Sequence, residues 1–402
     1  MTGSVNIDVL QTFFINAAEA GIPIYFVRNI MLKVWRPALI AGTLVAAACS
    51  GAHGPAQLPA VTGSSTSSTT HAAPVRTDAG DILIGDQFNN RVIQVDRNHQ
   101  IDWHFGDGSS KAGPASIVAP NDEERFGNFT LIAGTGAPQG SEPSCMQAAC
   151  PDNRAIIVDL GGHIVWQYGK AGVGGSGPNE LNTPVCTVRL PNGHILITDQ
   201  VNERVIEVDK AKNIDWQYGM TGVSGSGFNQ LNNPNSAELL PNGHILIGDE
   251  NNNRVIEVDR DSHKIVWQYG NPNSPKTLNG AAFASRLDNG DTLITDSNNN
   301  RVLEVNHDKD IVWSYVTNKR AGSVQMPLPT RAVRLGNGNT MISDQFNHQV
   351  IVVDPNKNVV FAQGKIATMG KTFDLLNAPY DAKVIGDFTG LTPPGDVSVP
   401  VK

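Results

Sequence analysis

The residue types that could do chemistry in this 402-residue chain recur in a fixed pattern. Asp, Asn and Arg stand as Asp-x-x-Asn-x-Arg at four places, and hard cations such as Ca2+ favour the oxygen ligands that such a motif offers. A fifth copy keeps Asp344 and Asn347 but has Gln349 in place of Arg. The four full copies begin at Asp86, Asp199, Asp249 and Asp296. Because each copy belongs to a separate repeat, we expect each Asp to cap its own turn and each Arg to tie neighbouring repeats, without a shared ion.

A second set of polar residues varies from repeat to repeat. It occupies the start of the segment that precedes each motif, and the sequence predicts that these positions surround one opening. The candidate ligand-binding residues are Cys186, Asn235, Ser236, Phe283, Arg331, Tyr380 and Asp381. Arg331 and Asp381 fall in neighbouring repeats, so an ion pair and a grip on a polar ligand are both open interpretations. Asn235, Glu238 and Asp381 are the candidate oxygen ligands for a divalent cation, with Ca2+ as the possible cofactor.

The elements that must position these residues are short strands. Trp103, Trp166, Trp216, Trp267 and Trp313 recur at intervals of 63, 50, 51 and 46 residues, and Phe361 follows after 48 more. One copy alternates strand patterns and turns: 235–240, 244–249, 254–259 and 264–269, a four-stranded antiparallel meander. A repeat of this length made of four strands is typical of a propeller blade, and we expect each Trp to wedge between adjacent blades.

The chain ends predict how the ring of blades closes. The first copy, from Gly80, lacks an innermost strand, and the last such strand, 380–385, has no partners after it. We therefore predict an all-β, six-bladed β-propeller of four-stranded antiparallel blades, in which N- and C-terminal strands share one blade. Closure removes the unpaired sheet edges that an open array would expose.

The second repeat departs from the others. Gly134 stands where other copies have the turn Asp, and the long segment 136–152 replaces a four-residue turn. Cys145 and Cys150 lie five residues apart in it, which suggests a local disulfide in an exported protein. Cys186 is then left as a free, buried thiol. Segment 136–152 is predicted to be a lid or a partner contact, with an ornamental insertion as the alternative.

The N-terminal region carries a targeting signal. We interpret residues 1–30 as a mis-called extension and 31–48 as a signal peptide, with Lys33 and Arg36 before a short apolar run. The Ala-Ala-Ala-Cys end resembles a bacterial lipoprotein box, which implies lipidation of Cys49; cleavage after Ala48 by ordinary signal peptidase is the alternative. Residues 49–78, rich in Ser, Thr, Pro and Ala, predict a flexible tether. Residues 391–402 are predicted to be a disordered tail.

The Asp-x-x-Asn-x-Arg-Val motif, preceded by Gly-x-Gly-x-Asn-x-Leu-Asn-x-Pro, resembles the NHL repeat over about residues 79–390. The resemblance implies a six-bladed propeller and leaves function open. The Ile-Val-Trp-Gln-Tyr-Gly segments also resemble blades of quinoprotein and arylsulfotransferase-like propellers. The formal net charge of −8 argues against a nucleic-acid partner.

Three functions remain open from the sequence, of which the third is a quinone-dependent oxidoreductase. The first is an exported, lipid-anchored, monomeric module of the cell envelope that binds or scaffolds an envelope protein, a glycan or a small molecule, touching the membrane only through Cys49. The second is a propeller enzyme, a lactonase-like hydrolase or a lyase, with a divalent cation at the mouth of the central channel.

Overall fold

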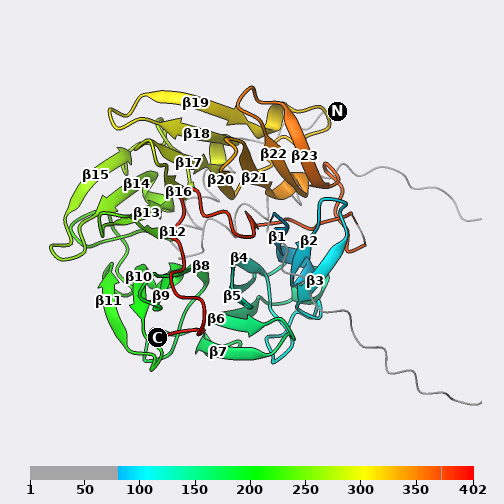
Figure 1. Cartoon of the computed structure of the whole chain (residues 1–402). Helices are drawn as coiled ribbons and strands as arrows, with labels where there is room; N and C mark the ends of the chain where they lie inside the picture. The colour runs from blue at the N-terminus through cyan, green and yellow to red at the C-terminus, as the bar shows by residue number, and fades with distance from the viewer. Residues whose placement is uncertain (1–79, 373) are drawn as a thin grey trace, which may run out of the picture. The chain divides into compact units, whose positions relative to one another are not determined.

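The computed structural model describes residues 80–372 and 374–402, which form a ring of six four-stranded antiparallel sheets (Figure 1). The predicted propeller, with its six blades, is confirmed. Within the described part of the chain the structure contains strands, turns and short 3-10 helices and no α-helix. The predicted extension 1–30, the signal peptide 31–48, Cys49 and the tether 49–78 lie outside the described residues.

The first blade joins the two ends of the chain. Its innermost strand, β24, pairs antiparallel with β1, with Asp381 opposite Gly85 and Val384 opposite Ile82. The N-terminal and C-terminal strands thus share one blade, as the sequence predicts. The strands of this blade, from the channel outward, are β24 (Asp381–Val384), β1 (Ile82–Asp86), β2 (Arg91–Val95) and β3 (Ile101–Phe105).

The other five blades are consecutive meanders, each with its first strand innermost. Blade 2 comprises β4 (Pro120–Phe126), β5 (Phe129–Ala137), β6 (Cys150–Asp159) and β7 (Ile164–Gly169). Blade 3 comprises β8 (Pro184–Arg189), β9 (Ile195–Asp199), β10 (Arg204–Val208) and β11 (Ile214–Tyr218). Blade 4 comprises β12 (Pro234–Leu239), β13 (Ile245–Asp249), β14 (Arg254–Val258) and β15 (Ile265–Gly270). Blade 5 comprises β16 (Ala281–Arg286), β17 (Thr292–Asp296), β18 (Arg301–Val305) and β19 (Ile311–Val316). Blade 6 comprises β20 (Arg331–Arg334), β21 (Thr340–Asp344), β22 (Gln349–Val353) and β23 (Val359–Gly364).

Short 3-10 helices connect the second and third strands of five blades. They follow the Asp of the repeated motif and end at a residue with left-handed backbone conformation, a region that Asn tolerates better than most residues do. These helices are η1 (Gln87–Asn89), η3 (Gln200–Asn202), η4 (Glu250–Asn252), η5 (Ser297–Asn299) and η7 (Gln345–Asn347). Two further 3-10 helices, η2 (Pro143–Cys145) and η6 (Thr317–Lys319), lie in connecting segments.

The repeated Asp, Asn and Arg form a structural network in each turn. In blade 4, one oxygen of Asp249 accepts a hydrogen bond from the backbone N–H of Asn232 at 2.8 Å. Its other oxygen accepts from Asn252 at 2.8 Å and from Arg254 at 2.7 Å. One carboxylate thus fastens both its own turn and the incoming linker. This agrees with the structural interpretation of the motif and leaves the four carboxylates in separate blades.

The hydrophobic core lies between the blades. Buried apolar side chains gather into six clusters, each built mainly from two neighbouring sheets. The repeated Trp residues cross these boundaries: the Trp216 indole N–H donates to the carbonyl of Arg260 at 2.9 Å, and the Arg260 guanidinium lies 5.2 Å from the Trp216 ring centroid. The Trp side chains therefore wedge between blades, as expected.

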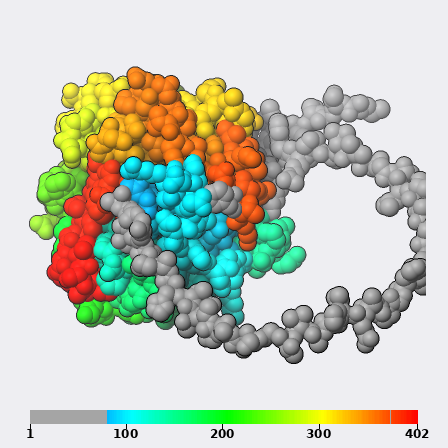
Figure 2. All heavy atoms as spheres, turned by 45° about the vertical axis from the view of Figure 1, so that its right-hand side comes forward, coloured from blue at the N-terminus to red at the C-terminus, as the bar shows by residue number. Residues whose placement is uncertain are grey.

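The C-terminal segment contradicts the prediction of a disordered tail over 391–402. It runs across the ring (red in Figure 1) and lies against its surface (Figure 2). The Arg189 side chain donates hydrogen bonds to the carbonyl oxygens of Val399 and Pro400, and Val401 is 2 % exposed in a core cluster. The segment lacks a strand pattern. It is held in place because its backbone carbonyl oxygens accept hydrogen bonds from the buried Arg189 guanidinium.

No helix among the described residues is long and apolar enough to cross a membrane.

Candidate functional site

The variable positions form one ring at the central channel. Each lies on an innermost strand, opposite the residue that precedes the turn Asp in the second strand: Asp381 faces Gly85, and Arg331 faces Ser343. All members are buried. The same register position holds Cys186, Ser236, Phe283, Arg331 and Asp381, as predicted, and Asp122 in blade 2.

Charged side chains inside this ring form a buried ion cluster. The Arg331 guanidinium lies 2.7 Å from an oxygen of Asp381 and 2.7 Å from an oxygen of Asp122. The Lys383 ammonium lies 2.5 Å from Asp122 and also contacts Asp381. The predicted pair of Arg331 and Asp381 is thus one edge of a cluster of four charges from blades 1, 2 and 6. The Arg331 guanidinium also lies 4.1 Å from the centroid of the Phe283 ring.

The two aspartates of the cluster titrate differently. Burial opposes the ionisation of Asp122, but the charges of Lys383 and Arg331 outweigh it and hold the pKa of Asp122 well below its usual range. Burial is the stronger influence on Asp381 and raises its pKa to about 6, against the opposing charges of Arg331 and Lys383. Burial thus favours the neutral form of Asp381 more than that of Asp122.

Three further carboxyl groups are buried around the channel. Burial raises the pKa of Glu123 and Glu238, and raises that of Glu124 to about 8. Glu123 has no hydrogen-bond partner for either carboxylate oxygen. A low-dielectric surrounding favours the neutral form of each glutamic acid, so this region is less acidic than its composition suggests.

Sequence reasoning missed Asp122, Lys383 and Glu124. The Asn121-Asp122 pair follows Pro120 as Asn235-Ser236 follows Pro234, but the missing turn Asp at Gly134 hid this register. Side chains alternate along a strand, so Lys383, two residues after Asp381, lies on the same side of the strand as Asp381. That signal could have found the second cation.

Tyr380 and Asn235 meet at the mouth of the channel, although they belong to opposite blades, 1 and 4. The Asn235 amide donates to the Tyr380 hydroxyl oxygen at 3.0 Å and to Glu250 at 2.7 Å. A second chain of amides links Gln345, Gln87 and Asn121, with distances of 2.9 and 2.7 Å. The mouth is therefore lined by polar side chains that bond one another, across the axis between Asn235 and Tyr380 and between neighbouring blades in the chain of amides.

The C-terminal segment covers the other end of the channel. The Thr392 backbone N–H and hydroxyl both donate to one oxygen of Glu238, at 2.9 and 2.6 Å. A cavity of about 10 Å³, lined in part by Glu124, Lys383 and Leu391, remains beneath the segment. Such a volume suits a single water molecule.

The candidate metal ligands do not converge. Asp381 is paired with Arg331 and Lys383, Glu238 accepts two hydrogen bonds from Thr392, and Asn235 bonds Tyr380 and Glu250. In residues 80–372 and 374–402, the one group of three candidate ligands within reach of one ion is Glu142, Cys145 and Cys150. Both sulfurs of this group are in a disulfide, so neither is a free thiolate ligand. The expected Ca2+ ligands Asn235, Glu238 and Asp381 are bonded to other side chains, so the structure does not bring them together around an ion.

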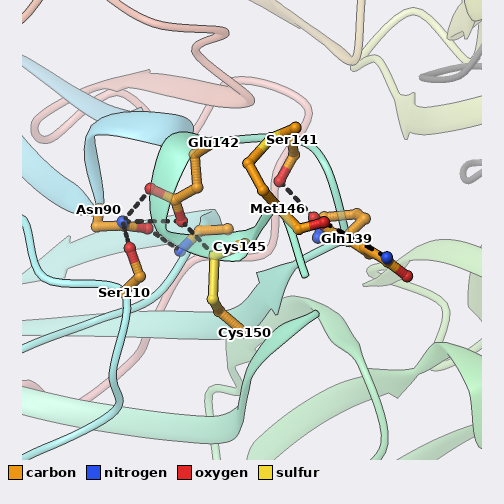
Figure 3. The surroundings of a disulfide bond; sticks show 10 residues. Asn90, Ser110, Gln139, Ser141, Glu142, Cys145, Met146 and Cys150 are labelled. Carbon is orange, nitrogen blue, oxygen red and sulfur yellow. Dashed lines mark hydrogen bonds between the residues drawn. A yellow bond between two sulfur atoms is a disulfide. The ribbon is translucent and has the colours of Figure 1, made fainter. Parts of the chain in front are cut away.

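The loop 136–152 is fastened at both ends. A disulfide joins Cys145 and Cys150, and the Asn90 amide donates to both oxygens of Glu142, at 3.1 and 2.9 Å (Figure 3). The loop of blade 2 is thus held against the η1 turn of blade 1. Cys186 is buried and unbridged, and burial raises the pKa of its thiol, so it stays protonated.

Gly134 has a packing reason. A Cβ at this position would lie 2.6 Å from the Asp152 side chain. Asp152 pairs with Arg154 at 2.5 Å and accepts from the backbone N–H of Val118 at 2.7 Å. Blade 2 thus forms the same network with Asp152, which follows the long loop in sequence, in place of an Asp at position 134.

The connections from each outermost strand to the next innermost strand lie at the channel-mouth end, and together with loop 136–152 they are called the linker face. They comprise 106–119, 170–183, 219–233, 271–280, 317–330, 365–372 and 374–380. Phe228 is 70 % and Met369 57 % exposed on these connections, whereas Met341, in strand β21, is 1 % exposed. The exposed large apolar residues of the linker face are Met146, Val173, Met220, Val223, Phe228, Met326 and Met369.

Comparison with known proteins shows no family for this chain. No protein-family model and no curated protein matches the chain. Virginiamycin B lyase from Staphylococcus aureus is similar at 14 % identity over 62 % of this chain and 70 % of that chain, with a TM-score of 0.41. A protein of unknown function from Bacteroides caccae shares 15 % identity over 71 % and 93 %, with a TM-score of 0.49. A candidate 6-phosphogluconolactonase from Bacteroides uniformis shares 10 % over 76 % and 99 %, with a TM-score of 0.45. The chain is a six-bladed β-propeller, and likenesses at this level of identity bear on the fold alone.

Proposed function

We propose that this chain is a binding propeller of the NHL type whose linker face holds a protein partner at the cell envelope. Export through the segment 31–48 and attachment through a lipidated Cys49 complete the proposal. The observation that carries it is the exposure of methionine: four of the five methionines among the described residues, Met146, Met220, Met326 and Met369, are exposed, and all four lie on the linker face.

Exposed methionine and phenylalanine are costly to leave in water and adapt well to a partner surface. Flexible thioether side chains fill irregular gaps, and Met and Phe are enriched at protein interfaces. The Asp, Asn and Arg network anchors these connections to the blades, which lowers the entropy lost when a partner binds.

The charges of the linker face specify the partner further. Among the described residues of the connections, six lysines are exposed against two exposed aspartates, Asp107 and Asp374. The lysines are Lys111, Lys170, Lys276, Lys319, Lys365 and Lys371. A protein of net charge −8 thus concentrates cations on this face. We infer a partner with an apolar contact surface bordered by carboxylates, because such a border steers association and selects orientation.

The channel supports binding at the surface more than chemistry inside. Its cations and aspartates pair with one another, its mouth is bonded across the axis between Asn235 and Tyr380, and Thr392 caps Glu238 at the far end. A substrate would have to displace these interactions to reach the buried carboxyl groups.

Site-specific photocrosslinking in cells of the source organism tests the proposal. A photoreactive residue in place of Phe228 should give a discrete crosslinked protein, and the same residue in place of Val266, 53 % exposed on the outer strand β15, should not. Excess wild-type chain should compete for the crosslink, whereas a chain carrying Met220→Ser, Phe228→Ser and Met369→Ser should compete at least about tenfold less well. Equal crosslinks from both positions, or equal competition by both chains, would contradict a specific linker-face partner.

A further inference from the structure

The blade 1 end of the linker face contains a cavity of about 290 Å³. Its walls combine η1, the connection that leaves β3 and the connection that enters β24. Asn89, Arg91, His104, Asp107 and Lys371 line it, and Gly106 and Gly108 contribute bare backbone. This volume falls at the small end of ligand cavities in proteins.

Two polar atoms of the lining residues lack hydrogen-bond partners. The side-chain oxygen of Asn89, a residue only 1 % exposed, accepts no hydrogen bond, and one terminal nitrogen of Arg91 donates none. The Asn89 amide nitrogen is fixed by Asp86 and by the Gly370 carbonyl, both at 2.7 Å, so its oxygen cannot exchange places with it. A buried acceptor and a buried donor left unsatisfied are costly, and such pairs of atoms commonly mark a ligand or water position.

The corresponding arginines of blades 3, 4 and 5 are satisfied by the protein itself. Arg204, Arg254 and Arg301 each donate from the equivalent terminal nitrogen to a carbonyl oxygen of the preceding connection, at 3.4, 3.2 and 2.9 Å. In blade 1 the Arg91 Nε pairs with Asp86 at 2.8 Å, but this second contact is missing.

Two substitutions within the repeat occur at this same place. Lys371 stands where the equivalent connections have Ser176 and Ser226, and His104 stands where three outer strands have glutamine. Both side chains are exposed. Within the repeat, only this end of blade 1 thus combines an unsatisfied Arg with an added Lys and His.

We propose that this cavity binds a small carboxylic acid that also carries a hydroxyl or ammonium group. Lys371 and Arg91 would receive the carboxylate, since charge-assisted hydrogen bonds to a carboxylate are the strong ones. The Asn89 oxygen and the Asp107 carboxylate would accept from the neighbouring O–H or N–H donor. Because Asp86 and Asp107 offset the charges of Arg91 and Lys371, a ligand with both an anion and a donor suits the site better than a bare anion. The site shares Lys371 with the exposed lysines of the linker face, but none of the apolar residues proposed to contact the protein partner lines it.

Calorimetric titration of the full-length chain distinguishes a hydroxy acid from an amino acid as the ligand. D-Gluconate supplies a carboxylate with hydroxyls, and L-serine supplies a carboxylate with an ammonium group. Acetate supplies the carboxylate alone, and D-glucose supplies hydroxyls alone. At least one of the first two should saturate the protein, with acetate and glucose binding about tenfold more weakly or not at all. No saturation by gluconate or serine at about 10 mM, or acetate binding equally well, would overturn the assignment.

Variants that restore the repeat residue locate the site. Lys371→Ser should weaken binding about tenfold, because it removes the ammonium donor next to the carboxylate, whereas His104→Gln keeps an N–H donor and should change the affinity less. Lys365→Ser, an exposed lysine of the same connection outside the cavity, is the matched control and should bind as wild type does. Equal affinities for Lys371→Ser and Lys365→Ser would place the ligand elsewhere and refute the proposal.

Discussion

Two rings of polar residues in this propeller are organised in opposite ways. The turn ring repeats: Asp199, Asp249 and Asp296 each accept a linker N–H at 2.7 or 2.8 Å and pair with an Arg at 2.7 or 2.8 Å. The channel ring does not repeat, and its position holds a different residue type in nearly every blade. A repeated polar group fastens one blade to the next, whereas the unrepeated charges must find their partners across the axis.

The two rings therefore differ in how much each carboxylate depends on a single cation. Each turn carboxylate has three donors, two close by in sequence and one on the incoming linker, so loss of one Arg leaves two contacts, as for Asp249. Asp122 and Asp381 share two cations, Arg331 and Lys383, from blades 6 and 1. Their other donors are uncharged groups of Thr187 and Glu123. Removing one cation in the channel should therefore cost more than removing one in a turn.

The largest expected effect is that of Arg331→Ala. It leaves two buried aspartates beside a single ammonium, and breaking a buried ion pair in this way typically costs 3–5 kcal/mol in the free energy of unfolding. Equilibrium unfolding in urea at pH 7 measures it. The matched turn variant is Arg301→Ala, whose side chain is 27 % exposed and should cost about 1 kcal/mol. Equal losses in the two variants would remove the distinction between the rings.

The turn ring could be predicted from sequence because it repeats. Recurrence of Asp-x-x-Asn-x-Arg identifies the turns, and the spacing of Trp identifies the blades, so strands such as β12 to β15 were placed to within a residue of their bounds. The closure of β24 on β1 follows from counting strands. These features are local or periodic, and each blade provides an independent copy of the same evidence.

The channel could be predicted only in part. Five of its six ring positions follow from the repeat, but Asp122 was hidden because blade 2 carries its turn Asp at 152, beyond the long loop. The pairing of charges depends on which blades face one another across the axis. The C-terminal segment was misjudged because Thr392 and Val401 are held by Glu238 and by a core cluster, neither of which a local pattern reveals.

A second test concerns the covered end of the channel. Burial raises the pKa of Glu124 from an ordinary 4.5 to about 8. Because the folded pKa is the higher one, the stabilisation is complete below pH 4.5 and is lost as the pH rises toward 8. Glu124→Gln keeps the neutral shape, so the variant should become more stable than wild type by roughly 4 kcal/mol near pH 8, with a difference below about 1 kcal/mol at pH 5.

Thermal unfolding at several pH values measures this change. Glu180→Gln is the control, because Glu180 pairs with Lys170 on the surface and its pKa is lowered, so it does not titrate in this range. A Glu124→Gln variant whose melting temperature ran parallel to that of wild type from pH 5 to 8 would show that Glu124 ionises as freely as a surface residue.

The smallest effect concerns one of two titratable residues that end the 3-10 turns, Glu203 in blade 3 and His348 in blade 6. The residue that ends each 3-10 turn accepts a hydrogen bond from the backbone of the next linker; in blades 4 and 5 it is an asparagine, Asn253 or Asn300. In blade 6 it is His348, whose Nδ1 accepts from the Ala378 N–H at 3.0 Å. This contact joins the last blade to the linker that closes the ring.

Burial lowers the pKa of His348 from 6.5 to about 4, so the neutral ring needed to accept this bond persists well below neutrality. Its contribution to stability is present above pH 6.5 and is lost as the pH falls through 4. His348→Asn keeps an acceptor, suits the left-handed backbone and cannot be protonated. It should match wild type at pH 7 and exceed it by about 1 kcal/mol near pH 4, the value of one hydrogen bond. In the same thermal unfolding experiment, His163→Asn is the control and should show no such gain, because His163 is exposed. A stability difference between His348→Asn and wild type that stayed constant with pH would mean that ring closure does not depend on the protonation of His348.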